Sequence, residues 1–336
     1  INKSYIFLVG LTLKIFLICI LAPEIHINFF LPFFLNNASG FSLDPWSNHI
    51  SIGGSIDSFP YGLSMYLGYL PLFQLSNTLA RIFSNDYFLR LGIGLTTILF
   101  DYSLLLSIFV ISRAFSKRIL LLAYWCSPIS IYILYWHGQL DIFPVSLLVW
   151  SVCALQYRKP LISGIIIGLA VSAKFSMLIA IPFFIVYLLR NIRLEGYLIK
   201  FLSGSIFVIF TTNIPYLFSF GYTQMVFRNP QSLKVLNVYI SYGEDLKLFL
   251  LPCIYLLIIY LIWRLEKISW DLFIISIGLG FFIILLLVSP APGWYLWPLP
   301  FLVLYQIKSK GDYLLTLIPF TLAFLLYNLL YQSGPI

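Results

Sequence analysis

Long apolar stretches follow one another along almost the whole chain, separated by short polar breaks. A helix needs about 20 mostly apolar residues to cross the roughly 30 Å hydrocarbon core of a bilayer, and the sequence offers about ten or eleven such stretches. Of the 336 residues, 61% are hydrophobic and 10% are charged, whereas a soluble domain is about half apolar and about a quarter charged. We therefore predict an all-α, polytopic transmembrane helix bundle.

No polar block is long enough to form a separate soluble domain, so residues 1–336 are predicted to form a single transmembrane domain. The net charge of +8 does not indicate a nucleic-acid partner, because Lys and Arg are scattered in small groups at the ends of apolar runs. The four cysteines lie inside apolar runs without the spacing of a metal site or a disulfide framework, so buried free thiols are expected. The first apolar stretch contains Lys14 and lacks a small-residue cleavage site, so we expect a retained helix.

Basic residues in the polar breaks predict the orientation, because cytoplasmic loops carry an excess of Lys and Arg. The basic breaks contain Arg113/Lys117/Arg118, Arg158/Lys159, Arg190/Arg193/Lys200, Arg264/Lys267 and Lys308/Lys310. Placing all of them inside, together with the N-terminus, predicts about eleven spans. These are expected near 4–23, 88–112, 119–135, 140–157, 161–173, 175–190, 199–219, 246–263, 271–289, 297–307 and 312–331.

Segment 61–83 is also apolar enough for a span, but counting it as one would move Arg113 and its basic neighbours outside. We therefore predict a helix that lies along the membrane interface, and we treat the aromatic stretch Ile27–Leu35 in the same way. Both segments then belong to a long first non-cytoplasmic loop, residues 24–87.

This topology gathers polar residues on the non-cytoplasmic face. The first outer loop holds Glu24, Asp44, Asp57, Arg81 and Asp86. Later turns and loops on that face hold His137, Gln139, Asp141, Lys174, Arg228, Asn229, Lys234, Glu244, Asp245 and the segment 289–297. A chain that places carboxylates, amides and cations on one side is expected to form a site there.

Two charges lie deep inside predicted spans, Lys14 in the first and Asp101 in the second. Both fall near the middle of the bilayer at a rise of about 1.5 Å per residue. Ionised groups of opposite sign inside a membrane are normally paired. We therefore expect a structural pair between adjacent helices, with a role in a substrate pathway as the alternative.

The order of these features resembles the GT-C glycosyltransferases, polytopic enzymes that take a sugar from a polyprenyl-phosphate carrier. An acid follows the first span and interfacial helices come after it. The sequence Trp136-His137-Gly138-Gln139-Leu140-Asp141 is similar to the Gly-Gln-x-Asp pattern of bacterial polyprenyl-phosphate-sugar transferases. Residues 164–174, GIIIGLAVSAK, followed by Pro182, are similar to a Gly-rich span of the family that ends in a lysine. The resemblance covers residues 1–190 well and 191–336 loosely.

The resemblance implies an integral membrane hexosyltransferase that moves a mannose- or glucose-type sugar, with inversion, from a polyprenyl phosphate to a glycan, lipid or protein hydroxyl. The active site would lie on the periplasmic, extracellular or lumenal side. Its implied partners are the donor, the acceptor and membrane lipids. No cofactor is implied; the first loop lacks the adjacent acidic pair of metal-dependent relatives, because Pro45 and Trp46 follow Asp44, and a divalent metal stays open.

Two other functions compete with the transferase. A transporter or lipid flippase would need polar residues that continue to the cytoplasmic side, whereas here they gather on the outer side. A non-catalytic subunit of a membrane complex would tolerate the loss of Asp44.

Each chemical step of the transferase has candidate residues. Asp44 is the predicted base for the acceptor hydroxyl, with a helix or turn cap as the alternative, since Asp-Pro commonly opens a turn. The candidate ligands of the donor phosphate are the cations Arg228, Lys174 and Lys234. The alternative is that these side chains extend to the lipid headgroups. The candidate sugar or acceptor ligands, which otherwise cap helices or anchor the chain at the interface, are Asp57, His137, Gln139, Asp141, Trp294 and Tyr295.

Overall fold

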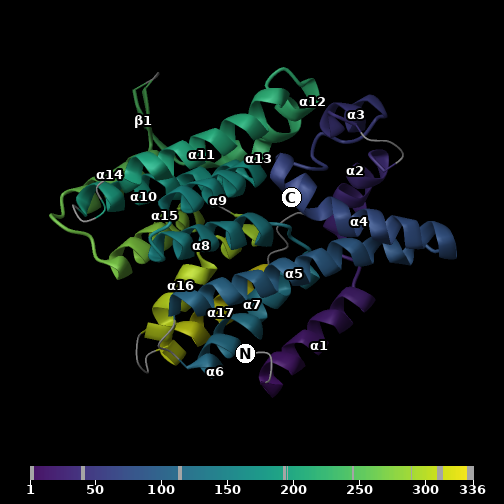
Figure 1. The fold of residues 1–336 in the computed structure, drawn as a ribbon, viewed down its shortest axis with the longest axis horizontal. Coiled ribbons are helices and arrows are strands. Elements are labelled where there is room, and N and C mark those ends of the chain that lie inside the picture. Colours follow the sequence, from purple (N-terminus) through teal and green to yellow (C-terminus); the bar gives the residue numbers. More distant parts are fainter. Residues whose placement is uncertain are drawn as a thin grey trace.

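The computed structural model describes residues 4–38, 42–112, 116–191, 194, 196–243, 246–288, 290–308 and 313–330, which are mostly helical (Figure 1). The prediction of an all-α protein is confirmed. Some residues of the predicted basic breaks and outer loops lie outside the described residues: Arg113, Arg193, Glu244, Asp245, Ser289 and Lys310.

The first third of the chain forms one long helix, a group of short helices and then two long helices. Here and below, short 3-10 and π-helical turns carry the label η. The elements are α1 (Tyr5–Ile20), η1 (His26–Phe30), α2 (Leu31–Asn36), α3 (Pro45–Ser51), α4 (Leu63–Phe83) and α5 (Tyr87–Ser112).

The middle of the chain alternates short turns with packed helices. Its elements are α6 (Lys117–Leu120), η2 (Leu121–Trp125), α7 (Pro128–Ile131), η3 (Tyr132–Trp136), α8 (Ile142–Gln156), α9 (Pro160–Ala173), η4 (Phe175–Ala180), α10 (Ile181–Arg190) and α11 (Tyr197–Asn213).

The last part begins with short turns and a β-hairpin and ends with apolar helices. Its elements are η6 (Ile214–Tyr216), α12 (Phe220–Tyr222), η7 (Thr223–Phe227), α13 (Pro230–Leu233), η8 (Lys234–Leu236), β1 (Tyr239–Tyr242), β2 (Leu246–Phe249), α14 (Leu250–Trp263), α15 (Trp270–Leu287), η9 (Pro292–Leu296), α16 (Leu299–Lys308) and α17 (Tyr313–Leu330).

Four helical segments of the described chain are long and apolar enough to cross a membrane, fewer than the expected eleven or so: Tyr87–Ser112, Lys117–Trp136, Tyr197–Tyr216 and Trp270–Leu287. Each of the other expected spans contains a helix that does not meet this criterion, such as the 14-residue α9. The 15-residue α8, for example, is about 22 Å long at about 1.5 Å per residue. It ends early because Arg158 adopts a positive φ of 57° and Pro160 starts the next helix.

The segment predicted to lie along the interface is one continuous 21-residue helix, α4, with Pro71 inside it. It packs against α5, and its C-terminal end extends to the right of the bundle in Figure 1. The aromatic stretch before it forms η1 and α2. The predicted helical structure of both segments is confirmed, and α4 is not one of the four segments long and apolar enough to cross a membrane.

The prediction that a helical span begins at residue 246 is wrong. Leu246–Phe249 forms strand β2, which pairs antiparallel with β1, and α14 begins only at Leu250. Gly243 lies in the connection between the strands with φ +67°, a conformation that glycine adopts without steric cost. An apolar run alone does not distinguish a strand from the first turn of a helix.

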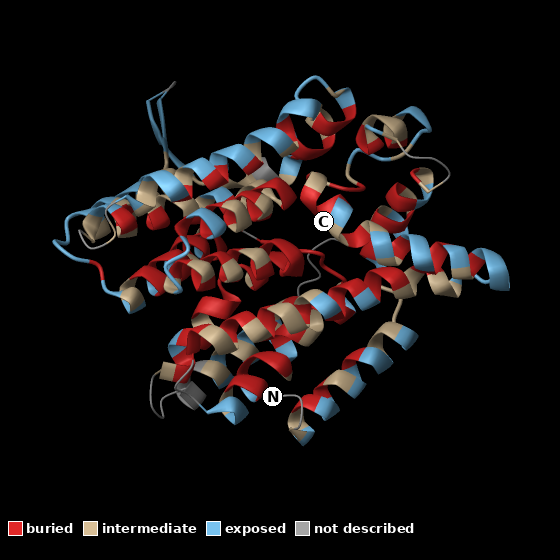
Figure 2. Ribbon diagram, viewed as in Figure 1, coloured by how far each residue is buried: buried red, intermediate tan, exposed pale blue. Residues whose placement is uncertain are grey.

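Several helices have exposed residues along their outer faces (Figure 2), and many of these residues are large and apolar. On α11, Ile199 and Phe207 are 74% and 66% exposed, and on α14 Leu256 is 62% exposed. So many exposed large apolar side chains are unusual on a soluble monomer. It is what a helix that faces lipid presents.

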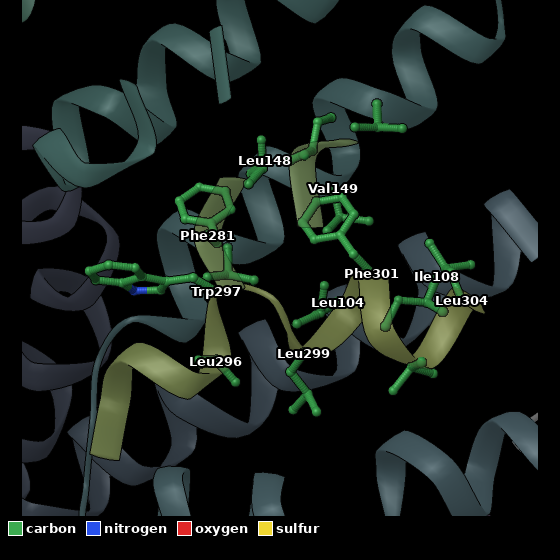
Figure 3. Close-up of a cluster of buried hydrophobic side chains, with 14 of the residues drawn as sticks. Leu104, Ile108, Leu148, Val149, Phe281, Leu296, Trp297, Leu299, Phe301 and Leu304 are labelled. Carbon is green, nitrogen blue, oxygen red and sulfur yellow. The ribbon is translucent and has the colours of Figure 1, made fainter. Parts of the chain in front are cut away.

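The largest apolar core lies where α5, α8, α15, η9 and α16 meet (Figure 3). Leu104 of α5, Leu148 of α8 and Phe301 of α16 are buried in it. The contact of α15 with α16 is close, because a Cβ on Gly278 would lie 2.7 Å from the Cβ of Phe301. This core packs η9 and the following Trp297 against α5, α8, α15 and α16.

The predicted pairing of Lys14 with Asp101 is confirmed. The Lys14 ammonium donates to Oδ2 of Asp101 at 2.6 Å, and both side chains are fully buried. The hydroxyls of Tyr124 and Tyr135 also donate to this carboxylate, at 2.7 Å each. The ammonium lies 3.3 Å from the centroid of the Trp125 ring, so a cation–π contact adds to the ion pair.

Candidate functional site

A cavity of about 340 Å³ has mainly apolar walls and a small set of polar side chains. Its lining comes from distant parts of the sequence, from Ile25 directly before η1 to Trp297 before α16. The polar members of the lining are Asp57, Gln139, Lys174, Ser176, Asn229 and Gln231. Ligand sites commonly have this composition, an apolar wall with a few polar groups that fix orientation.

Lys174 and Asp141 form an ion pair at the edge of this cavity. The Lys174 ammonium donates to both carboxylate oxygens of Asp141, at 2.7 Å each. The Asp141 side chain is fully buried, whereas that of Lys174 is 18% exposed and lines the cavity. The pair therefore presents its cationic member to the cavity.

The α8–α9 hairpin brings these two residues together. Asp141 directly precedes α8 and Lys174 directly follows α9, so both lie at the open end of the hairpin. The hydroxyls of Ser151 and Ser163 each donate to the carbonyl of the other residue, at 2.8 and 2.9 Å, and lock the two helices in register. Lys174 itself is extended, with φ −151° and ψ 120°, which ends α9 before η4 begins.

Two aromatic residues also donate hydrogen bonds to the Asp141 carboxylate. The Tyr61 hydroxyl donates to Oδ1 at 2.9 Å, and the Trp297 indole donates to Oδ2 at 2.7 Å. The Lys174 ammonium lies 5.0 Å and 5.2 Å from the centroids of the same two rings. Burial, followed by the negative charge of Asp141, raises the pKa of Tyr61 well above its ordinary value, so Tyr61 stays a neutral donor.

The loop of Tyr61 is fixed against the end of α9. The backbone N–H of Gly62 donates to the Ala173 carbonyl at 3.0 Å. A Cβ on Gly62 would lie 2.0 Å from the Ser172 carbonyl oxygen, so no other residue type fits without displacement of the backbone. This close approach places Tyr61 beside Lys174.

The His-Gly-Gln segment has a structural glycine at its centre. Gly138 has φ +82°, and a Cβ there would lie 2.6 Å from the Cβ of Pro23. The His26 ring donates from Nε2 to the Gly138 carbonyl at 2.7 Å. His137 is not part of the cavity lining, and its Nδ1 is buried without a hydrogen-bond partner in the described part of the chain. Burial lowers the pKa of His137 to about 4, so the ring is neutral near pH 7.

Gln139 reaches the cavity because the chain turns at Gly138. The Tyr61 hydroxyl lies 3.4 Å from Oε1 of Gln139, and the side chain packs on Gly293 so closely that a Cβ there would lie 2.5 Å from Cδ. Two other polar atoms of the lining, Ser176 Oγ and Gln231 Oε1, are buried and have no hydrogen-bond partner among the described residues. Such atoms normally have a partner, so a polar ligand is the natural one.

The structure brings together part of the predicted site. Asp57, Gln139, Lys174 and Trp294 line the cavity, and Asp141 lies directly behind Lys174. The predicted base, Asp44, lines none of the cavities that the structure describes, and its Oδ1 accepts the backbone N–H of Ser47 at 3.0 Å as the N-cap of α3.

The remaining predicted residues lie beside the cavity. Arg228 is exposed and Lys234 is half-buried; neither is in the lining, although Asn229, Gln231 and Val235 are. Tyr295 instead packs its ring 4.9 Å from that of Phe324.

Sequence reasoning missed Tyr61, Ser176 and Gln231 as candidate site residues. Ser176 follows Lys174 closely in sequence, which is a weak signal, and Tyr61 follows Pro60 at the start of an apolar segment. Among the described residues, no three His, Cys, Asp or Glu side chains are grouped so that they could hold a metal ion. Comparisons with protein-family models, with curated proteins and with solved structures find no match to this chain.

Proposed function

We propose that this chain is a multi-pass membrane glycosyltransferase of the GT-C type, which transfers a hexose from a polyprenyl phosphate to an acceptor hydroxyl. The observation that carries the proposal is the cavity beside Lys174. It combines apolar walls with a carboxylate, an ion-paired lysine and two buried polar atoms that lack partners among the residues that the structure describes. A donor made of hydrocarbon, phosphate and sugar has a chemical group for each of these features.

The wall of the cavity suits an amphipathic donor. Ile179, Val226 and Ile284 offer apolar surface to a prenyl chain. Ser176 Oγ and Gln231 Oε1 offer hydrogen bonds to sugar hydroxyls. Trp294 is stacked on Trp297, with ring centroids 5.0 Å apart and an interplanar angle of 17°, and both line the cavity. An indole face packs well against the C–H face of a hexose.

We assign the base to Asp57 in place of Asp44. Among the described residues, no hydrogen bond or ion pair engages the Asp57 carboxylate, which lines the cavity. The carboxylate of Asp44 is occupied by the N-cap of α3. In the proposed reaction Asp57 takes the proton of the acceptor hydroxyl, and the oxygen forms a bond to the anomeric carbon. The bond from that carbon to the phosphate oxygen breaks, and the polyprenyl phosphate leaves with the electron pair.

The leaving phosphate needs more than Lys174. The ion pair with Asp141 is neutral as a unit, so Lys174 contributes directed N–H groups but no net charge. Arg228 and Lys234 flank the lining residues Asn229 and Gln231 and have no ion-pair partner among the described residues. We propose that one or both supply the net positive charge as the phosphate departs.

The proposed orientation puts the cavity on the non-cytoplasmic side. It follows the basic breaks of the sequence, which are expected to stay in the cytoplasm. In this arrangement the shorter apolar helices, such as α8 and α9, also cross the bilayer, because neighbouring helices rather than lipid surround much of them. The segment α4 lies along the interface.

The test is sugar transfer by purified protein from radiolabelled polyprenyl-phosphate mannose and glucose to hydroxyl acceptors, with donor binding measured in parallel. Asp57→Asn keeps the shape and removes the proton acceptor, so turnover should fall by about 10²-fold or more while donor binding changes little. Asp44→Asn makes the same chemical change at the α3 cap. If Asp44→Asn abolishes transfer and Asp57→Asn does not, the base is Asp44. A wild-type protein that neither binds nor uses any such donor would overturn the proposed function in favour of a transporter.

A further inference from the structure

A second hollow in the protein shares no lining residue with the cavity beside Lys174. It is an open groove of about 900 Å³ between the short helices η1 and α2 and the connection from α4 to α5. One wall is apolar, formed by Ile27, Leu31 and Leu35. Arg81, Asp86 and Arg90 are the charged residues of the lining.

The two arginines of the lining lie on either side of the α4–α5 turn in the sequence. Arg81 lies in the last turn of α4, which ends at Ser84 in the left-handed conformation with φ 49°. The Asn85 side chain then accepts the Tyr87 backbone N–H at 2.9 Å, and α5 begins. Arg90 lies in the first turn of α5, with its guanidinium carbon 5.2 Å from the centroid of the Tyr87 ring. The Tyr87 hydroxyl donates to the Cys19 carbonyl at 2.7 Å, which ties this turn to the end of α1.

The charge of the groove is unbalanced. Among the described residues, neither arginine is in an ion pair, and Asp86 is the only acidic side chain of the lining. Arg90 also stands in the first turn of a helix, where the partial positive charge of the helix end disfavours a cation. Two guanidinium groups and one carboxylate leave a net positive charge that an anion would neutralise.

We propose that this groove binds an anionic phospholipid, with its phosphate at Arg81 and Arg90 and its hydrocarbon chain along the apolar wall. Guanidinium groups match phosphate oxygens in geometry and charge. The apolar wall is accessible, because Ile27 and Leu35 are 45% and 39% exposed. A soluble phosphate would use the arginines and leave this wall uncovered. The proposal does not depend on the transferase, because it uses none of its residues.

The test uses the full-length protein in a neutral detergent, with binding of phosphatidylglycerol and of phosphatidylcholine measured by native mass spectrometry. The wild type should prefer the anionic lipid. Arg81→Gln and Arg90→Gln should each weaken phosphatidylglycerol binding by about tenfold, the size expected for one charge-assisted hydrogen bond. Asp86→Asn should have the opposite effect, because it removes the one repulsive carboxylate. Arg264→Gln is the matched control, since Arg264 is an exposed arginine at the end of α14 and lines none of the cavities described here.

The three variants keep the proposal falsifiable even if one of them is poorly folded, because Asp86→Asn is expected to gain affinity. Equal binding of both lipids by the wild type, or equal losses in Arg81→Gln and Arg264→Gln, would overturn the proposal and leave only general attraction to headgroups. Displacement of the lipid by millimolar inorganic phosphate, with no contribution from chain length, would show a site for soluble phosphate instead.

Discussion

The ammonium of Lys174 contacts both carboxylate oxygens of Asp141, at 2.7 Å each, across the open end of the α8–α9 hairpin. Asp141 also accepts from Tyr61 and Trp297, so this one carboxylate orients three side chains that line the cavity. These donors occupy both carboxylate oxygens, and Asp141 does not itself line the cavity. Its role is to position the side chains around it.

Removal of the Asp141 charge should therefore destabilise the protein strongly. Asp141→Asn leaves Lys174 without its partner in a largely buried place, and the loss of one member of a buried ion pair costs about 3–5 kcal/mol. Thermal unfolding of the purified protein in detergent measures this. Asp271→Asn is the matched control, because Asp271 pairs with Lys308 at an exposed site, where about 0–1 kcal/mol is expected. Equal losses in the two variants would show that the Asp141 pair is not a structural requirement.

His26 should make stability depend on pH. Burial, with a smaller effect of His137, lowers the pKa of His26 to about 4 in the folded protein, whereas an unfolded His has an ordinary value of about 6.5. Between these values the unfolded chain binds the extra proton. The contribution of His26 to the free energy of unfolding should rise by about 1.4 kcal/mol for each pH unit in this range. This contribution is lost as the pH falls from about 6.5 to about 4.

The measurement is thermal unfolding at several pH values between 4.5 and 7. His26→Gln keeps an N–H donor for the Gly138 carbonyl and removes the titration, so its dependence on pH should be shallower than that of the wild type. Burial also lowers the pKa of His137 to about 4, so His26→Gln should reduce the dependence of stability on pH without abolishing it. A slope unchanged by His26→Gln would mean that His26 does not titrate on unfolding as described.

The apolar runs were sufficient to predict the helices, and the two intramembrane charges were sufficient to predict the Lys14–Asp101 pair. The sequence placed Asp141 and Lys174 at the same end of neighbouring spans, which is consistent with the observed pair. It could not predict the contact itself, because the contact depends on the register of the two helices in the hairpin. Hydrophobicity could not separate β2 from α14. The unpartnered atoms of Ser176 and Gln231 could not be foreseen, because their burial depends on elements far away in the sequence. For Asp44, the alternative prediction of a helix or turn cap agrees with the hydrogen bond that its carboxylate accepts from the Ser47 backbone N–H.

The Lys14–Asp101 pair should behave as a coupled unit. Asp101→Asn leaves a buried ammonium without its counter-charge and two tyrosine hydroxyls with a weaker acceptor, so the unfolding temperature in detergent should fall. Lys14→Met in the same chain removes the uncompensated charge and should recover part of the loss. A double-mutant cycle gives the coupling energy, and additive effects of the two changes would contradict a direct interaction.

The last prediction concerns the glycine of the His-Gly-Gln segment. Gly138 and Gly53 have nearly the same backbone conformation, with φ +82° and +86°, but their surroundings differ. A Cβ on Gly53 would have nothing within 4 Å, whereas one on Gly138 would lie 2.6 Å from Pro23 Cβ and 2.8 Å from His26 Nε2. Gly53→Ala should cost about 1–2 kcal/mol, the strain of an L-residue in the left-handed region. Gly138→Ala should add about 1–3 kcal/mol for overpacking, and it should push His26 away from the Gly138 carbonyl.

Thermal unfolding in detergent compares the two alanine variants directly, and the difference between them isolates the contact with Pro23 and His26 from the backbone strain that both share. Because Gln139 follows Gly138, displacement at this point should also move the Gln139 side chain off Gly293, where its Cδ now packs. Equal losses of stability for Gly138→Ala and Gly53→Ala would show that Pro23 and His26 can move away from the added Cβ without a cost in free energy. The glycine would then be needed for its positive φ alone, and the fit between the end of α1 and the turn before α8 would not fix the position of Gln139.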